Sequence, residues 1–141
     1  MTLAQRNLQS TRLIHLSFLF AAVAYTAIPF LIALPKAAPP SAVIIGAFAV
    51  ISISTLAAGF FIRARLVQPA SELLRANPED GAAGGRWRIG VMLALVFAES
   101  VLLFGFALRI LGASWAVCGG FYGVGIFFLV AWTPKLELAP R

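Results

Sequence analysis

Charged residues are scarce in this sequence. Only 11% of the 141 residues are charged, with 5 Asp and Glu among them, whereas a soluble domain carries about 25%. Hydrophobic residues make up 61%, and the mean hydropathy is +0.94. A small soluble protein has too little interior to bury so much apolar side chain. The composition therefore excludes an ordinary water-soluble domain and predicts an integral membrane protein whose apolar surface contacts the lipid bilayer.

Cysteine and histidine are almost absent, with one of each, Cys118 and His15. One cysteine cannot form an intrachain disulfide, and the pair is too small for a structural metal site. The sequence also offers no paired carboxylates, no nucleophile beside a base and no phosphate-binding glycine loop. We therefore expect neither an enzyme nor a metal site. His15, near the end of an apolar run, is expected to cap a helix or lie at the membrane interface.

Four apolar runs approach or exceed the length of about 20 residues that a helix needs to cross the hydrocarbon core. They cover residues 13–34, 42–62, 89–108 and 114–132. The first continues well past a site that resembles a signal-peptide cleavage site, so we expect a retained helix. The sequence predicts an all-α fold over residues 1–141, a four-span transmembrane bundle. Two helical hairpins would be joined by a cytoplasmic loop, residues 63–88.

The basic residues give the chain a net charge of +6 and predict its orientation. They lie at the ends of the apolar runs, so we expect lipid headgroups and not nucleic acid as their partners. One predicted side holds only Lys36 and Arg109. The other holds nine basic residues: Arg6, Arg12, Arg63, Arg65, Arg75, Arg86, Arg88, Lys135 and Arg141. By the positive-inside rule, both termini and the loop are expected in the cytoplasm, with the bacterial inner membrane as the expected location.

The predicted loop 63–88 has two interpretations. Pro69 suits the start of a short helix, Asn77-Pro78 its end, and Gly81–Gly85 a flexible connector. In the first interpretation the loop is anchored to lipid headgroups. The anchoring residues would be Arg63, Arg65, Arg86, Trp87 and Arg88. In the second it docks a soluble partner through Arg75, Asn77, Pro78 and Glu79.

One carboxyl group, that of Glu99, lies near the middle of the third run, about 15 Å from either end at about 1.5 Å per residue. An acidic group at this depth costs about 2.5–3.5 kcal/mol on insertion scales, so we expect it to be largely neutral. Hydroxyl groups at similar depth are its candidate partners, namely Tyr25, Ser52, Thr55 and Tyr122. Such a group predicts either a proton or cation site or a hydrogen bond between helices.

Small residues predict where helices pack closely. Gly119 and Gly123 form a pair at four-residue spacing in the fourth run. Glycine lets helix backbones approach each other in a membrane. The approach is either within the chain or to another subunit.

Residues 75–111 resemble the helical hairpin of the ATP synthase proteolipid, the rotor subunit c. The loop Arg75-Ala76-Asn77-Pro78-Glu79 is similar to the polar loop of that family, and Phe97-Ala98-Glu99 is similar to its carboxylate-bearing helix. The resemblance implies that Glu99 carries an ion and that the loop around Pro78 contacts a stalk.

Three functions stay open. The first is a small accessory or scaffold subunit of a larger integral-membrane complex, with a bioenergetic complex expected and other integral-membrane subunits as partners. The second is a proton- or cation-handling protein that uses Glu99. The third is a helper that binds a hydrophobic cofactor, such as a quinone, pigment or haem, through aromatic side chains and His15. The sequence does not specify which cofactor, if any, is bound.

Overall fold

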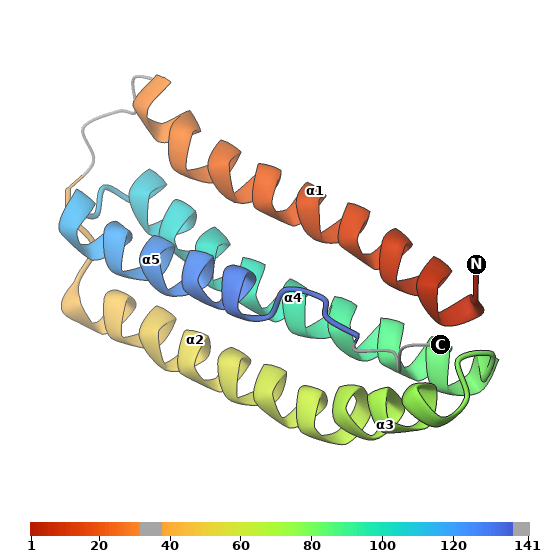
Figure 1. Cartoon of the computed structure of the whole chain (residues 1–141). Helices are drawn as coiled ribbons and strands as arrows, with labels where there is room; N and C mark the ends of the chain where they lie inside the picture. The colour runs from red at the N-terminus through yellow and green to blue at the C-terminus, as the bar shows by residue number, and fades with distance from the viewer. Residues whose placement is uncertain (32–37, 137–141) are drawn as a thin grey trace.

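The computed structural model describes residues 1–31 and 38–136, and its regular elements are helices. Four helices run side by side along one axis (Figure 1). They are α1 (Leu3–Leu31), α2 (Ala42–Ile62), α4 (Gly81–Ile110) and α5 (Trp115–Ala131). A π-helical turn, η1 (Arg63–Val67), and a short helix, α3 (Gln68–Ala76), prolong α2. The predicted all-α class with four main helices is confirmed.

Three of these helical stretches are long and apolar enough to cross a membrane: α1, the continuous stretch Ala42–Ala76, and α4. Helix α5 is apolar but shorter, with 17 residues. At about 1.5 Å per residue it spans about 25 Å, slightly less than the hydrocarbon core of about 30 Å. The structure thus contains three candidate spans and a shorter apolar helix, and the fourth span stays a prediction.

The predicted ends hold for α2, which begins at Ala42 and ends at Ile62. The predicted loop 63–88 and its flexible connector Gly81–Gly85 are wrong, because η1, α3 and the start of α4 make most of this segment helical. Asp80 begins α4, since its Oδ1 accepts a hydrogen bond from the backbone N–H of Ala83 at 2.9 Å. Only residues 77–80 lie outside a helix here.

The π-helical turn η1 lies immediately before a proline. Its wider hydrogen bond runs from the N–H of Gln68 to the carbonyl of Arg63. Pro69 has no N–H, and in a regular α-helix its ring would clash with the carbonyl four residues earlier. A π-bulge changes this register and lets the helix continue. Helix α3 therefore follows without a break and ends at Ala76, directly before the Asn77-Pro78 pair that the sequence predicts as its end.

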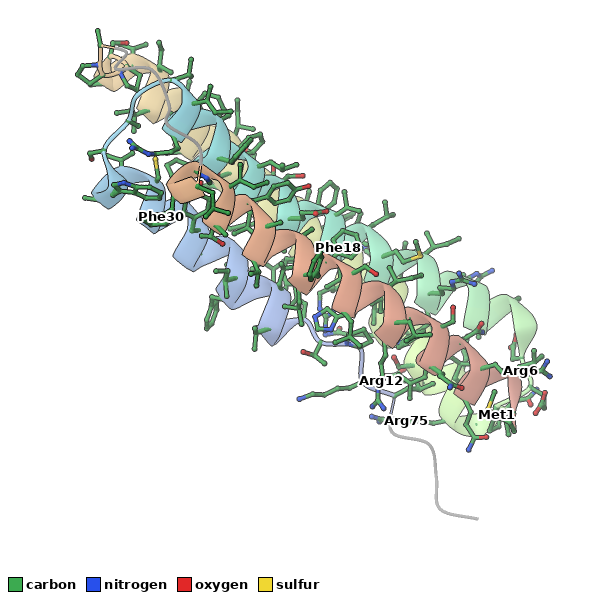
Figure 2. The ribbon with its side chains drawn as sticks, turned by 90° about the horizontal axis from the view of Figure 1, so that it is seen from above. Met1, Arg6, Arg12, Phe18, Phe30 and Arg75 are labelled. Carbon is green, nitrogen blue, oxygen red and sulfur yellow. The ribbon has the colours of Figure 1, made fainter. Side chains whose placement is uncertain are left out.

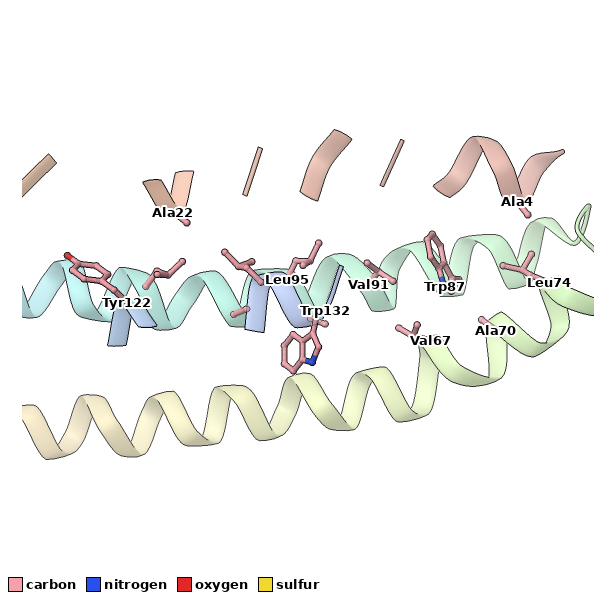
Figure 3. Close-up of a cluster of buried hydrophobic side chains, with 14 of the residues drawn as sticks. Ala4, Ala22, Val67, Ala70, Leu74, Trp87, Val91, Leu95, Tyr122 and Trp132 are labelled. Atoms are coloured by element: carbon pink, nitrogen blue, oxygen red, sulfur yellow. The ribbon is translucent and has the colours of Figure 1, made fainter. Parts of the chain in front are cut away.

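Helix α4 lies at the centre of the bundle. Its buried side includes Trp87, Val91, Leu95 and Leu102. Helix α1 packs on one flank of α4, and α2 with η1 and α3 packs on the opposite flank (Figures 1 and 3). Helix α5 covers a third side. The fourth side of α4 is here called its open face. It carries apolar side chains that are 37–56% exposed: Ile89, Leu93, Val96, Leu103 and Ile110.

The contact between α4 and α5 depends on two glycines. A Cβ atom added to Gly125 would lie 2.6 Å from Cγ of Leu102, and one added to Gly105 would lie 2.9 Å from Cβ of Phe121. Such distances are too short for carbon atoms that are not bonded, so only glycine permits this separation of the two helices. In contrast, a Cβ atom on Gly123 would meet nothing within 4 Å.

We expect Gly125→Ala to lower the free energy of unfolding by about 1–3 kcal/mol, because the added methyl group overpacks the α4–α5 contact. The matched control is Gly123→Ala on the same helix, which should leave stability unchanged or raise it slightly through better helix propensity. Unfolding in a denaturing detergent, followed by circular dichroism, measures both. Equal losses in the two variants would show that the α4–α5 contact at Gly125 is not close.

Candidate functional site

Glu99 lies at the boundary between the buried side of α4 and its open face. Val96, three residues before it, is 43% exposed, and Leu103, four residues after it, is 39% exposed. Residues at these spacings share one side of a helix. Leu95 and Leu102, four residues before and three residues after Glu99, have the same spacing but are fully buried. Glu99 therefore lies at the edge of the open face of α4, and the residue is half-buried.

The structure does not bring the four predicted hydroxyl partners to Glu99. The hydroxyl of Ser52 donates to the carbonyl of Phe48 at 2.8 Å, and that of Thr55 donates to the carbonyl of Ile51 at 2.8 Å. Both hydrogen bonds stay within α2.

The two tyrosines join α1 to α5 instead. The hydroxyl of Tyr122 lies 3.4 Å from the carbonyl oxygen of Tyr25, to which it donates. The ring of Tyr25 packs against that of Phe106, with 5.9 Å between the centroids. Across residues 1–31 and 38–136, no side chain donates a hydrogen bond to the Glu99 carboxyl.

Ser52 lines a groove of about 280 Å³ between α2 and α5. Val101 of α4 forms its floor, and Gly120 and Val124 of α5 lie on one side. The groove is almost entirely apolar, and it is separated from the open face of α4 by the body of that helix.

The predicted packing glycines, Gly119 and Gly123, face outward. Both are exposed, and a Cβ atom on either would meet nothing within 4 Å. They form no close helix contact in the part of the chain that is described. The glycines that do so are Gly105 and Gly125. Neither belongs to the four-residue pair, and the sequence offers no spacing signal for Gly105.

One predicted headgroup anchor, Trp87, is wrong. Its side chain is fully buried among α1, α3 and α4 (Figure 3), and its Nε1 has no hydrogen-bond partner within the described residues. Arg65 and Arg86 are exposed, whereas Arg63 and Arg88 are partly buried. The guanidinium of Arg63 lies 5.7 Å from the ring centroid of Trp132, a cation–π distance.

The predicted docking segment contacts the start of α1. The carbonyl of Pro78 accepts a hydrogen bond from the N–H of Ala4 at 3.1 Å, and Oε2 of Glu79 accepts one from the N–H of Leu3 at 3.4 Å. A carboxylate at a helix N-terminus is favourable because unpaired N–H groups point toward it.

The side chain of Asn77 accepts a hydrogen bond from the N–H of Glu79 at 3.2 Å. Arg75 is exposed on α3.

His15 caps the end of α5. Its ring is buried, and its Nε2 lies 2.8 Å from the carbonyl oxygen of Leu129. A carbonyl oxygen can only accept, so Nε2 carries the hydrogen and donates it. The last four carbonyls of a helix have no partner within that helix. The imidazole therefore satisfies one of these and ties α1 to the end of α5.

The basic residues gather at one end of the bundle. Arg6, Arg12 and Arg75 lie at the end that carries Met1, and Phe30 lies at the opposite end (Figure 2). At that opposite end, Arg109 donates from Nη1 to the carbonyl of Ala113 at 2.8 Å.

Comparison with known proteins assigns no relative. No protein-family model matches the sequence, and neither a curated protein nor a solved structure matches it significantly. The resemblance to the ATP synthase proteolipid therefore stays a prediction. No group of three or more His, Cys, Asp or Glu residues among the described residues could hold a metal ion.

We expect His15→Phe to lower the free energy of unfolding by about 1–3 kcal/mol, because the Leu129 carbonyl would be left buried without a donor. His15→Gln serves as the control, since its amide N–H₂ keeps a donor at similar reach. Unfolding in a denaturing detergent compares the two variants. Equal stability of His15→Phe and the unmodified protein would show that this hydrogen bond does not contribute.

Proposed function

We propose that this chain is a small accessory or scaffold subunit of a larger integral-membrane complex, of bioenergetic type. The observation that supports this most is the position of Glu99. A carboxyl group near mid-length of an apolar helix lies half-buried at the edge of the open face, and no described residue donates a hydrogen bond to it. In a monomer, such a group would face lipid.

The cost of that arrangement favours a covering subunit. An acidic side chain at mid-depth costs about 2.5–3.5 kcal/mol, and acidic groups within spans almost always face protein or water. Helices in membranes associate through packing and hydrogen bonds between polar side chains. A second protein on the open face of α4 would remove Glu99 from lipid and give it a partner.

The proposed arrangement in the membrane has four spans with α5 as the fourth. The clustered basic residues at the end that carries Met1 favour a cytoplasmic location for this end and for both termini. The exposed Arg65 and Arg86 would contact anionic headgroups there. A soluble partner could dock at the same end, but Pro78 and Glu79 are already engaged with α1.

The second candidate is proton or cation handling by Glu99. Its position at the edge of the open face is compatible with exchange to a group on a neighbouring subunit, and the described part of this chain supplies no relay to it. The third candidate, a helper for a quinone, pigment or haem, is less favoured because Nε2 of His15 is held by the Leu129 carbonyl.

We expect the tagged protein, extracted from its native membrane in mild detergent, to elute in an assembly much larger than 15.0 kDa. Mass spectrometry should identify other integral-membrane chains in stoichiometric amounts. A control extraction in a harsh detergent should release the chain alone. Recovery alone or as a homo-oligomer in mild detergent would contradict the accessory function.

The variant Glu99→Gln tests proton handling, because an amide keeps hydrogen bonding but cannot ionise. For an accessory subunit, we expect the assembly to stay intact and proton coupling across the membrane to stay unchanged. Loss of proton coupling in an intact assembly would instead make the second candidate the function.

A further inference from the structure

We infer that the open face of α4 binds a transmembrane helix of another protein, and that this helix carries a hydrogen-bond donor at the depth of Glu99. The inference rests on the proposed function and names the binding surface and the chemistry of the partner. It joins three observations on one helix: exposed apolar side chains along the open face, a carboxyl group at the edge of that face near mid-length, and the absence of any helix of the described chain over the face.

The chemistry of the partner follows from what the face offers. The carboxyl oxygens of Glu99 accept hydrogen bonds in either protonation state, and Ser100 next to it donates its own hydroxyl to the carbonyl of Val96 at 2.9 Å. The open face therefore presents acceptors near its middle and apolar surface above and below. The complementary helix would be apolar with one donor, such as Lys, Arg, Asn or Ser, where it meets Glu99.

A second copy of this chain fits the face less well. Two copies that insert with the same orientation would place their Glu99 side chains at one depth, carboxyl against carboxyl. Two ionised carboxylates would repel each other, and two neutral carboxyl groups would have only each other's O–H as donors. Among the described residues of the open face, the neighbouring hydroxyl of Ser100 already donates to the carbonyl of Val96.

The length of the face also suits a helix. From Ile89 to Ile110 it covers 21 residue steps, or about 32 Å at about 1.5 Å per residue, close to the thickness of the hydrocarbon core. Its exposed side chains are separated by 4, 3, 7 and 7 residues, or one to two helical turns, so they form one stripe along the helix.

Site-specific photo-crosslinking in the native membrane locates the partner. A photoreactive amino acid at Val96 or Leu103, on the open face, should capture a second membrane protein. The control positions are Val124 and Phe127, which are 42% and 64% exposed on α5 and should capture much less of the same protein. Capture mainly from α5 would overturn the inference and leave the proposed function standing. Capture of only a second copy of this chain would overturn it as well.

The donor is tested by two variants of similar size. Glu99→Leu removes the acceptor and should weaken recovery of the captured partner in mild detergent about tenfold, which corresponds to the loss of one hydrogen bond in a membrane. Glu99→Gln keeps a carbonyl acceptor and should retain most of the partner. If Glu99 simply faces lipid, Glu99→Leu should leave partner recovery unchanged and stabilise the protein, and this result would overturn the inference. The amount of each variant in the membrane is measured alongside, so that a folding defect is recognised.

If no partner is recovered with the unmodified protein, the proposed function fails together with the inference. If an assembly is recovered but neither Val96 nor Leu103 crosslinks within it, the inference alone fails.

Discussion

The close contact between α4 and α5 is the constraint on which the rest of the bundle depends. Gly105 and Gly125 let these two helices approach until side chains of one touch the backbone region of the other. With α5 on that side, α1 and α2 pack on the two flanks of α4. The opposite side is then left without a helix, and the carboxyl of Glu99 lies at its edge. The position of the candidate site thus follows from a glycine contact on the far side of the same helix.

Composition predicts the all-α class and the bounds of α2, because this helix is an uninterrupted apolar run between Ser41 and Arg63. The starts of α1 and α4 lie 10 and 8 residues before their predicted starts, since 13 − 3 = 10 and 89 − 81 = 8. Both early segments are polar and helical because they pack on each other. A Cβ atom on Gly84 would lie 2.5 Å from Nδ2 of Asn7. Apolar runs predict the apolar part of a helix. They miss a polar helical segment that is stabilised by contact with another helix.

The candidate site was predictable in part. The depth of Glu99 can be counted along the sequence, but the side of the bundle that it faces depends on the rotation of α4 about its axis. That rotation is fixed by contacts of Gly105 and Leu102 with α5, which are distant in sequence. For the same reason, hydroxyl groups at matching depth, such as those of Ser52 and Tyr122, lie elsewhere. Trp87 was assigned to the interface by its place at the end of a run, although α1 and α3 extend far enough to cover it.

The hydrogen bond from His15 to Leu129 joins residues 114 apart in sequence. During synthesis, α1 is made first and α5 last, so this contact can form only after all the helices of the bundle have been made. Until then α4 has two uncovered sides, one of which α5 will occupy. The closing of α1 onto the end of α5 would therefore mark the completion of biogenesis. A partner that arrives earlier would meet both sides of α4, and one that arrives later would meet only the open face.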